Sequence, residues 1–302
     1  MAGTSSTVEP PLEGKGAPAD PNLIRIRDLI YRLCGIYMPD NKYYFLGDRC
    51  GRRMKVVGAS SFSDYLDQLT LGSNRDAELR ALLNEITVGE TCFFRNQPQL
   101  DAVMKIILPK MLESKRKSGY RRLRVWSSGC STGEEPYTLA MLLMEASQSL
   151  LVGWQFEIQA TDLNDHSLAR CKEGLYSDYA LRNSPEFYRQ KYFTPEGDQF
   201  RIRDEVKARV EFQRLNLRDD TRMVFMKGLD LIFCCNVLIY FDGAAKRRTV
   251  QHYFNALLPG GYFFLGHSES LYGVNDQFRL VHFPKATAYW KPVPDAPAGG
   301  AK

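Results

Sequence analysis

The segment from Leu123 to Ala140, LRVWSSGCSTGEEPYTLA, constrains the fold of this chain more than any other. It predicts a strand over 123–126, a loop of small residues that holds Gly129 and Gly133, and a helix that begins at Glu134. Glycines in such a loop allow a ligand to approach the backbone closely at the N-terminus of the helix. The order of strand, glycine loop and helix therefore predicts a site for a nucleotide-like ligand.

The residues in and after the loop restrict the kind of ligand. Ser131 stands where the dinucleotide fingerprint has its middle glycine, and Glu134 and Glu135 follow the loop directly. The two carboxylates would repel a pyrophosphate, but they would not repel a ligand that carries ribose hydroxyls and a positive sulfonium. The loop thus favours S-adenosylmethionine. The alternative is that both glutamates only complement the helix dipole and face solvent.

The pattern of apolar residues divides the 302 residues into two domains. Residues 22–86 carry apolar positions at helical spacing and predict a small all-helical domain, and residues 87–97 read as a linker. Over 98–292, strands and helices alternate, which predicts an α/β, Rossmann-like domain with a parallel sheet. Its last two strands, 278–283 and 287–291, are expected to pair antiparallel at one edge.

Three further segments depart from this plan. The alternation is interrupted over 179–209, where two short apolar stretches flank a Pro-Glu-Gly-Asp turn, so a small inserted β-subdomain is expected there. The tails, residues 1–21 and 293–302, are expected to be disordered.

Composition bears on the compartment and on metals. The seven cysteines show no Cys-x-x-Cys spacing, which argues against metal sites and a disulfide framework and favours a reducing cytoplasm. The apolar run 231–241 is too short to span a bilayer. We expect a cytoplasmic, monomeric protein that does not insert into membranes.

The net charge of +5 is unevenly placed, because two regions, within 25–55 and 105–124, are strongly basic. Such regions imply an acidic partner. In the first of them, Arg49, Arg52 and Arg53 are spaced to form one stripe on a helix, which we interpret as a docking surface. A solvated helix face is the alternative.

Polar residues follow several of the predicted strands, where doubly wound sheets bind their ligands. Asp162 ends the second strand and is suited to accept hydrogen bonds from ribose hydroxyls. Asn216 and Asn236 end later strands, each followed by an apolar residue suited to an adenine ring, although capping is the alternative for both asparagines. In the linker, Arg95 follows the pair Phe93-Phe94 and is expected to point between the domains.

Five ordered motifs carry a resemblance to a known family. They are Thr91-Cys-Phe-Phe-Arg95, Ser131-Thr-Gly-Glu-Glu-Pro-Tyr137, Ala160-Thr-Asp-Leu-Asn164, Asn236-Val-Leu-Ile-Tyr-Phe-Asp242 and Gly266-His-Ser-Glu-Ser270. From about Pro21 to Pro292 the chain resembles the CheR-type chemotaxis receptor methyltransferases. The resemblance implies a protein-glutamate O-methyltransferase that uses S-adenosyl-L-methionine (SAM), releases S-adenosyl-L-homocysteine, and acts on the cytoplasmic helical domain of chemoreceptors.

The resemblance also implies roles for single residues. Arg95 and Tyr240 match the catalytic pair of the family. The positions that match its cofactor site are Gly89, Thr91, Arg95, Gly129, Glu134, Asp162, Asn216, Leu217, Asn236 and Val237. The chain departs from the family pattern at Gly89, where asparagine is frequent, and at Cys235, where arginine is frequent.

Two other functions remain open at this point. A nucleic-acid methyltransferase would suit the basic regions. However, Asn236-Val-Leu-Ile replaces the Asn-Pro-Pro-Tyr type that holds a flipped base, and no cysteine follows a proline. A cofactor-bound adaptor without turnover is the non-enzymatic alternative, which the presence of Arg95 and Tyr240 disfavours.

Overall fold

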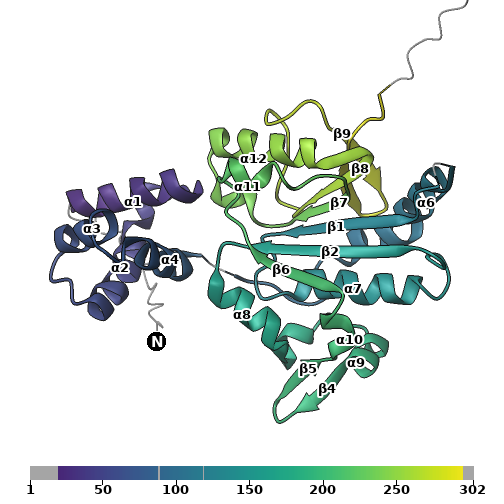
Figure 1. Ribbon diagram of the computed structural model, residues 1–302, viewed down its shortest axis with the longest axis horizontal. Helices are drawn as coiled ribbons and strands as arrows, with labels where there is room; N and C mark the ends of the chain where they lie inside the picture. The colour runs from purple at the N-terminus through teal and green to yellow at the C-terminus, as the bar shows by residue number, and fades with distance from the viewer. Residues whose placement is uncertain (1–19, 88, 118, 295–302) are drawn as a thin grey trace, which may run out of the picture.

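A computed structural model describes residues 20–87, 89–117 and 119–294. In it a group of helices lies beside one end of a seven-stranded sheet, and a small second sheet projects from the edge of that sheet (Figure 1). The tails expected over 1–21 and 293–302 lie almost entirely outside the described residues. Within the described part of the chain, no helix is long and apolar enough to cross a membrane.

The helical domain, residues 20–87, is built from helices with clear end signals. Asp20 accepts a hydrogen bond from the Asn22 backbone N–H at 2.7 Å, which starts the first helix, and Gly35 ends it with a left-handed φ of 77°. Ile26 and Tyr65 are fully buried where the helices pack together. The elements are α1 (Pro21–Cys34), η1 (Asp40–Lys42), α2 (Tyr43–Val57), α3 (Phe62–Thr70) and α4 (Arg75–Ile86).

A continuous helical stretch follows the linker. It comprises α5 (Gln97–Ala102), a π-helical turn η2 (Val103–Ile107) and α6 (Leu108–Lys117). Pro98 lies in the first turn, where its missing N–H leaves no helical bond unmade.

The large sheet has the strand order β6-β2-β1-β7-β8-β10-β9. The first five of these strands are parallel, whereas β10 pairs antiparallel with both β8 and β9, so the antiparallel edge predicted from the sequence is confirmed. The strands are β1 (Arg122–Ser128), β2 (Gln155–Asp162), β6 (Val210–Arg214), β7 (Leu229–Cys234), β8 (Leu257–Leu265), β9 (Arg279–Phe283) and β10 (Ala286–Trp290).

Helices cover both faces of this sheet. Neighbouring residues on each strand point to opposite faces, and both sets are apolar, so each face packs against helices. Val125 and Leu231 belong to the core shared with the helix after β1, whereas Trp126 and Ile232 belong to the core shared with the helix before β8. The α/β, Rossmann-like fold class is confirmed. The helices of this domain are α7 (Glu134–Ala146), α8 (Asp165–Glu173), α11 (Asp220–Met223), η4 (Leu238–Tyr240) and α12 (Gly243–Ala256).

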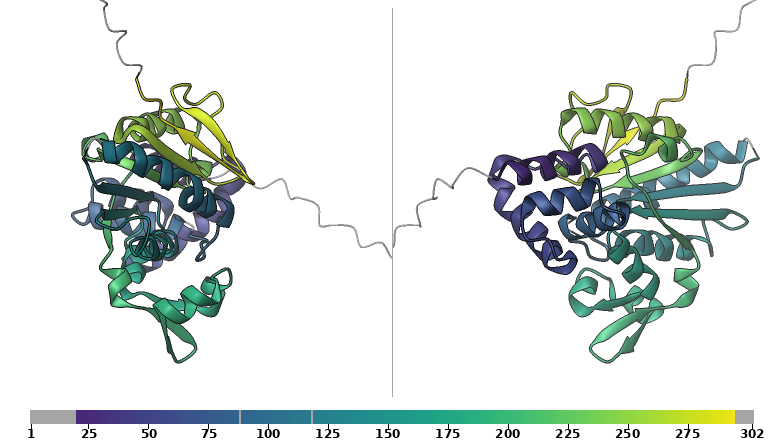
Figure 2. Two further views of the ribbon diagram at one scale, coloured as in Figure 1. Left: turned by 90° about the vertical axis from the view of Figure 1, so that its right-hand side faces the viewer. Right: turned by 60° about the vertical axis from the view of Figure 1, so that its left-hand side comes forward.

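The inserted subdomain contains one strand more than the predicted hairpin. Its sheet has the order β3-β5-β4, and the hairpin of β4 and β5 projects away from the large sheet in all views (Figures 1 and 2). The extra strand begins at Leu175, before the segment 179–209 in which we expected the insertion. This strand has only three residues, which are too few to show the alternation of apolar and polar residues by which a strand is predicted. The elements are β3 (Leu175–Ser177), η3 (Asp178–Leu181), α9 (Glu186–Tyr192), β4 (Phe193–Glu196), β5 (Gln199–Ile202) and α10 (Asp204–Lys207).

Side chains at the end of α4 fasten the helical domain to the start of α8. The Asn164 Nδ2 donates to the Asn84 carbonyl at 3.0 Å and to the Thr87 hydroxyl at 2.8 Å. The Asp165 N–H donates to Asn84 Oδ1 at 2.9 Å. The junction is therefore held by specific hydrogen bonds as well as by packing.

A second set of bonds joins the end of α1 to the segment around η4. The Tyr37 N–H donates to the Tyr240 carbonyl at 2.8 Å, and Ile36 forms an antiparallel bridge with Phe241. The Tyr31 hydroxyl donates to Asp242 at 2.9 Å. The helical domain is thus bonded directly to the loop that carries Tyr240.

The basic stripe expected on α2 needs a correction. Arg53 points inward and forms two hydrogen bonds to the buried carboxylate of Glu78, at 2.7 and 3.0 Å, and Tyr65 donates to the same carboxylate. Arg53 therefore holds α2 against α4 and is not available to a partner. Arg52 is 57% exposed, and Arg49 stacks over the Phe45 ring.

We predict that Arg53→Ala lowers the free energy of unfolding by about 3 kcal/mol, because it leaves the Glu78 carboxylate buried without its cation. Arg52→Ala is the matched control, since an exposed pair within one helix contributes about 0.5 kcal/mol or less. Urea unfolding followed by circular dichroism measures both variants. Equal midpoints for the two variants would contradict the structural role of Arg53.

Candidate active site

A cavity of about 300 Å³ opens at the carboxyl ends of β1, β2 and β7. The chain runs outward from β1 to β2 and β6, and then returns to β7 on the other side of β1. Open α/β sheets bind ligands at this reversal of strand order. Ile36 and Thr87 of the helical domain complete the wall, so both domains contribute to the site.

The glycine loop lies at the bottom of the cavity. The N–H groups of Gly129 and Cys130 both donate to the Thr161 carbonyl, at 2.7 and 2.9 Å, which ties the loop to the end of β2. Gly129 has a φ of 75°, and a Cβ placed on it would lie 2.4 Å from Val237 Cγ2. Only glycine fits here, because the loop after β7 occupies the space of any side chain.

Asp162 holds the backbone around the cavity in place. Its Oδ2 accepts from the Ser131 N–H and its Oδ1 from the Asn164 N–H, each at 2.8 Å. Burial raises the pKa of this carboxyl, and the backbone donors oppose that shift. A carboxylate has about four lone-pair sites, so acceptor capacity remains that ribose hydroxyls could use.

Ser131 has features typical of a ligand-binding position. Among the described residues its hydroxyl, buried in the cavity wall, has no hydrogen-bond partner, and its backbone φ is 50°. Four non-glycine residues of the described chain have positive φ, and three of them, Phe94, Ser131 and Asn236, line this cavity. Such conformations concentrate where function requires them. Gly89 lies close to Ser131: a Cβ placed on it would lie 2.4 Å from the Ser131 hydroxyl oxygen, which would have to rotate away.

The two glutamates after the loop differ in placement, and neither faces solvent. Glu135 lines the cavity and accepts from the Ser127 hydroxyl at 2.7 Å. Glu134 is buried beside the cavity, accepts from the Thr132 hydroxyl at 2.7 and 2.9 Å, and is absent from the described wall. Burial raises the pKa of both carboxyls. Of the two, Glu135, which the sequence analysis did not select, is therefore the one in contact with the cavity.

The residues expected around an adenine ring lie together in the wall. Leu217, Asn236 and Val237 line the cavity, with the asparagine at the end of β7. Asn216 lines it too, but its Nδ2 donates to the Leu33 carbonyl at 2.7 Å and its Oδ1 accepts from the Arg218 N–H at 3.0 Å. The side chain of Asn216 is thus already used to hold α1.

The linker is anchored to the inserted subdomain. The Phe93 ring packs edge-on against Tyr176 and Phe193, with centroids 4.8 and 5.0 Å apart, and the Phe94 ring lies 4.9 Å from Tyr188. The two phenylalanines therefore fix the linker to the inserted subdomain. Thr91 and Arg95, on the same linker, line the cavity.

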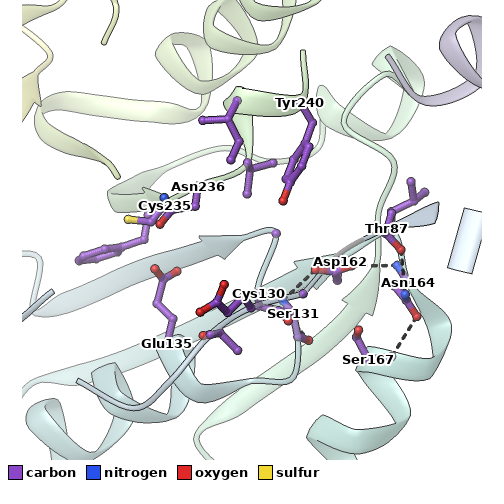
Figure 3. A pocket seen from close by; sticks show the side chains of 18 of the residues that line it. Thr87, Cys130, Ser131, Glu135, Asp162, Asn164, Ser167, Cys235, Asn236 and Tyr240 are labelled. Atoms are coloured by element: carbon purple, nitrogen blue, oxygen red, sulfur yellow. Dashed lines mark hydrogen bonds between the residues drawn. The ribbon is translucent and has the colours of Figure 1, made fainter. Parts of the chain in front are cut away.

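Arg95 and Tyr240 both line the cavity. In Figure 3 the Tyr240 hydroxyl points into the cavity toward the wall that holds Ser131 and Asp162. Burial raises the pKa of this hydroxyl, although nearby Arg95 opposes the shift, so the phenol is protonated at neutral pH. Arg95 donates to the Glu90 carbonyl at 2.6 Å and makes no other hydrogen bond within the described chain.

Comparison with known proteins decides the family. Residues 89–287 match the CheR methyltransferase SAM-binding domain, and residues 21–87 match the CheR methyltransferase all-alpha domain. The chain belongs to the CheR methyltransferase family.

Relatives are similar over most of their length. The chain is 34% identical to chemotaxis protein methyltransferase 2 of Vibrio cholerae, over 90% of this chain and 93% of the relative. It is also 34% identical to the chemotaxis protein methyltransferase of Borreliella burgdorferi, over 83% of this chain and 88% of that one. The resemblance seen in the motifs is therefore confirmed.

SAM is the cofactor of this CheR-family protein, and the residues present suit it. The described wall carries three carboxylates, Glu90, Glu135 and Asp162, and one guanidinium, Arg95. This balance favours a cationic ligand over a phosphate-bearing one. The Ser131 hydroxyl, which has no partner among the described residues, and the remaining lone pairs of Asp162 are the polar groups that such a ligand would engage.

Sequence reasoning missed some residues of this CheR-family site. Asn164 connects the cavity wall to the helical domain, and Gln99, through its Nε2, donates to the Leu265 carbonyl at 2.6 Å behind Cys235. Asn164 lies in the Ala160–Asn164 motif and directly precedes α8, whose first N–H groups it caps, and an asparagine before a helix start is a usable sequence signal. Gln99 has no comparable signal in the sequence.

We predict that Gly129→Ala weakens SAM binding by at least about tenfold. The new Cβ would overlap Val237, so the loop would have to shift away from the position that binds SAM. An L-residue at this φ also adds about 1–2 kcal/mol of backbone strain, and a binding free energy weaker by 1.4 kcal/mol corresponds to a tenfold higher dissociation constant. Gly197→Ala is the matched control, since Gly197 also has a positive φ, 62°, with nothing within 4 Å of an added Cβ. Isothermal titration with SAM checks both; equal affinities for the two variants would refute the close-approach argument.

Proposed function

We propose that this protein transfers the methyl group of SAM to glutamate side chains in the cytoplasmic helical domain of chemoreceptors, forming glutamyl methyl esters. The observation that supports this is that Arg95 and Tyr240 both line the cavity, with the Tyr240 hydroxyl pointing toward the wall that holds Ser131 and Asp162. The names of the relatives connect the family to chemotaxis. A receptor domain in the cytoplasm would require a cytoplasmic enzyme, in accord with seven cysteines that are all free.

The acceptor needs no general base. A free glutamate side chain has a pKa of about 4.3 and is ionised at neutral pH. When SAM is bound, it supplies a methyl group on a sulfonium sulfur; the new bond joins carboxylate oxygen and methyl carbon, and the electron pair of the broken bond stays on sulfur. The protein therefore has to orient the reactants, and orientation can account for several kcal/mol, up to about 7–11.

Two side chains in the cavity suit this task. The Arg95 guanidinium has donors in a planar fork that matches a carboxylate. The protonated Tyr240 hydroxyl is a donor that can fix the second carboxylate oxygen. Because a strong ion pair would also make the nucleophile less reactive, we assign positioning to the pair more than neutralisation. For the cofactor we assign Gly89, Thr91, Gly129, Asp162, Asn236 and Val237 to contacts in the wall, with Leu217 beside the adenine.

Two cofactor assignments from the family pattern need refinement. Glu135 takes the contact that we first gave to Glu134, because it is the glutamate in the described cavity wall. The side-chain amide of Asn216 already donates to the Leu33 carbonyl. Asn216 would therefore contact the cofactor through its backbone or by packing, and not by a hydrogen bond from that amide.

We predict that Arg95→Ala nearly abolishes methyl transfer while the SAM dissociation constant changes by less than about tenfold, because one orienting group is lost and the cofactor wall stays. The assay incubates labelled SAM with receptor-bearing membranes and releases the label by mild alkali as methanol. Label that resists alkali would exclude a carboxyl ester. Full activity of the variant would remove Arg95 from the mechanism.

The acidic partner is proposed to dock on α2. With Arg53 occupied by Glu78, the surface that remains is Arg52 and the edge of Arg49, where Arg52 makes an exposed pair with Asp48 at 3.1 Å. Charges at such a rim alter mainly the association rate and its salt dependence.

We predict that the double variant Arg49→Glu, Arg52→Glu slows receptor methylation at low salt by about tenfold or more, and that the difference from wild type shrinks as salt is raised. Turnover of a receptor that is already bound should be unchanged in this variant, because Arg95 and Tyr240 are unaltered. Initial rates at several salt concentrations measure this. If the double variant methylates receptors as fast as wild type at low salt, the receptor does not dock on this part of α2.

A further inference from the structure

The loop after β8 holds a carboxylate to which the proposed chemistry assigns no role. Glu269 lies in the Gly266–Ser270 motif and is not part of the described cavity wall. The segment that it contacts, however, carries Asn236 and Val237 at its start and Tyr240 at its end. All three line the cavity.

Three backbone donors converge on this one carboxylate. Glu269 Oε2 accepts from the Asn236 N–H at 2.6 Å and from the Gly266 N–H at 2.8 Å. Its Oε1 accepts from the Ile239 N–H at 3.1 Å. Hydrogen bonds to an ionised acceptor are stronger than neutral ones, so the carboxylate holds both ends of segment 236–239.

The held segment is bent in a way that requires support. Asn236 has a φ of 63°, and left-handed backbone costs energy for any residue except glycine. Gly266 packs against it so closely that a Cβ there would lie 2.9 Å from Asn236 Nδ2 and 2.9 Å from Glu269 Oε2. The absence of a side chain at Gly266 thus allows the loop to reach Asn236.

Tyr240 is fixed from two directions as a result. On one side Glu269 binds the N–H of Ile239, the residue just before it, and on the other the Tyr37 N–H donates to the Tyr240 carbonyl. We propose that Glu269 is a positioning residue for methyl transfer. It sets the bend at Asn236 and thereby the direction of the Tyr240 hydroxyl into the cavity; this inference rests on the role proposed for Tyr240.

The carboxylate form is required by the number of donors. A glutamine has one acceptor oxygen, and its amide nitrogen would face an N–H group as a second donor. Glu269→Gln therefore keeps the volume of the side chain but releases at least one of the three N–H groups. Glu269→Ala releases all of them.

The test measures the single-turnover rate of methyl transfer from labelled SAM to receptor-bearing membranes at saturating SAM. Active sites are counted by titration with S-adenosylhomocysteine, so that the rate refers to folded, binding-competent protein. We expect Glu269→Gln to lower this rate about tenfold and Glu269→Ala to lower it further. His267→Ala is the control, because the exposed His267 of the same loop makes no hydrogen bond within the described chain, and its rate should match wild type.

A double-mutant comparison separates positioning from general stability. In a Tyr240→Phe background the hydroxyl to be oriented is absent, so Glu269→Gln should lower the rate by less than about twofold. The proposal is overturned if Glu269→Gln alone stays within twofold of wild type, or if its tenfold loss persists in the Tyr240→Phe background. A Tyr240→Phe variant with full activity would instead refute the proposed catalytic role of Tyr240.

Discussion

The structure depends on the close approach of two loops at the carboxyl ends of β1 and β7. Gly129 has no side chain there, and Val237 fills the space that one would occupy. Each loop also contains a non-glycine residue in left-handed backbone, Ser131 in one and Asn236 in the other. Carboxylates offset this strain: the Ser131 N–H is held by Asp162, and the Asn236 N–H by Glu269. The cavity is therefore shaped before any ligand arrives, which reduces the ordering that binding requires.

The helical domain also helps to form the cavity. Ile36 and Thr87 form part of the cavity wall, and hydrogen bonds from Asn164 and Tyr37 fasten the two domains at separate points. A domain that only carried a docking surface would need neither wall residues nor such bonds. The arrangement therefore keeps the proposed docking surface on α2 at a fixed distance and direction from Arg95 and Tyr240, the proposed catalytic pair.

Much of this fold could be predicted from the sequence, because long periodic segments and end signals are local. The helix over 165–173 and the antiparallel edge strands are examples. Facts that depend on packing could not be predicted. Arg52 and Arg53 are neighbours in the sequence, but only the approach of α4 shows that Arg53 meets Glu78. Likewise, the phase of α7 decides that Glu135, not Glu134, borders the cavity.

The backbone bond between Tyr37 and Tyr240 limits how such proteins can be recombined. Because it joins main-chain atoms, no compensating side chain can replace it if the end of α1 shifts. A chimaera that exchanged residues 20–87 for the same region of a relative would have to preserve the path of the chain after Gly35. Exchange of the helical domain alone would therefore also disturb the position proposed for Tyr240.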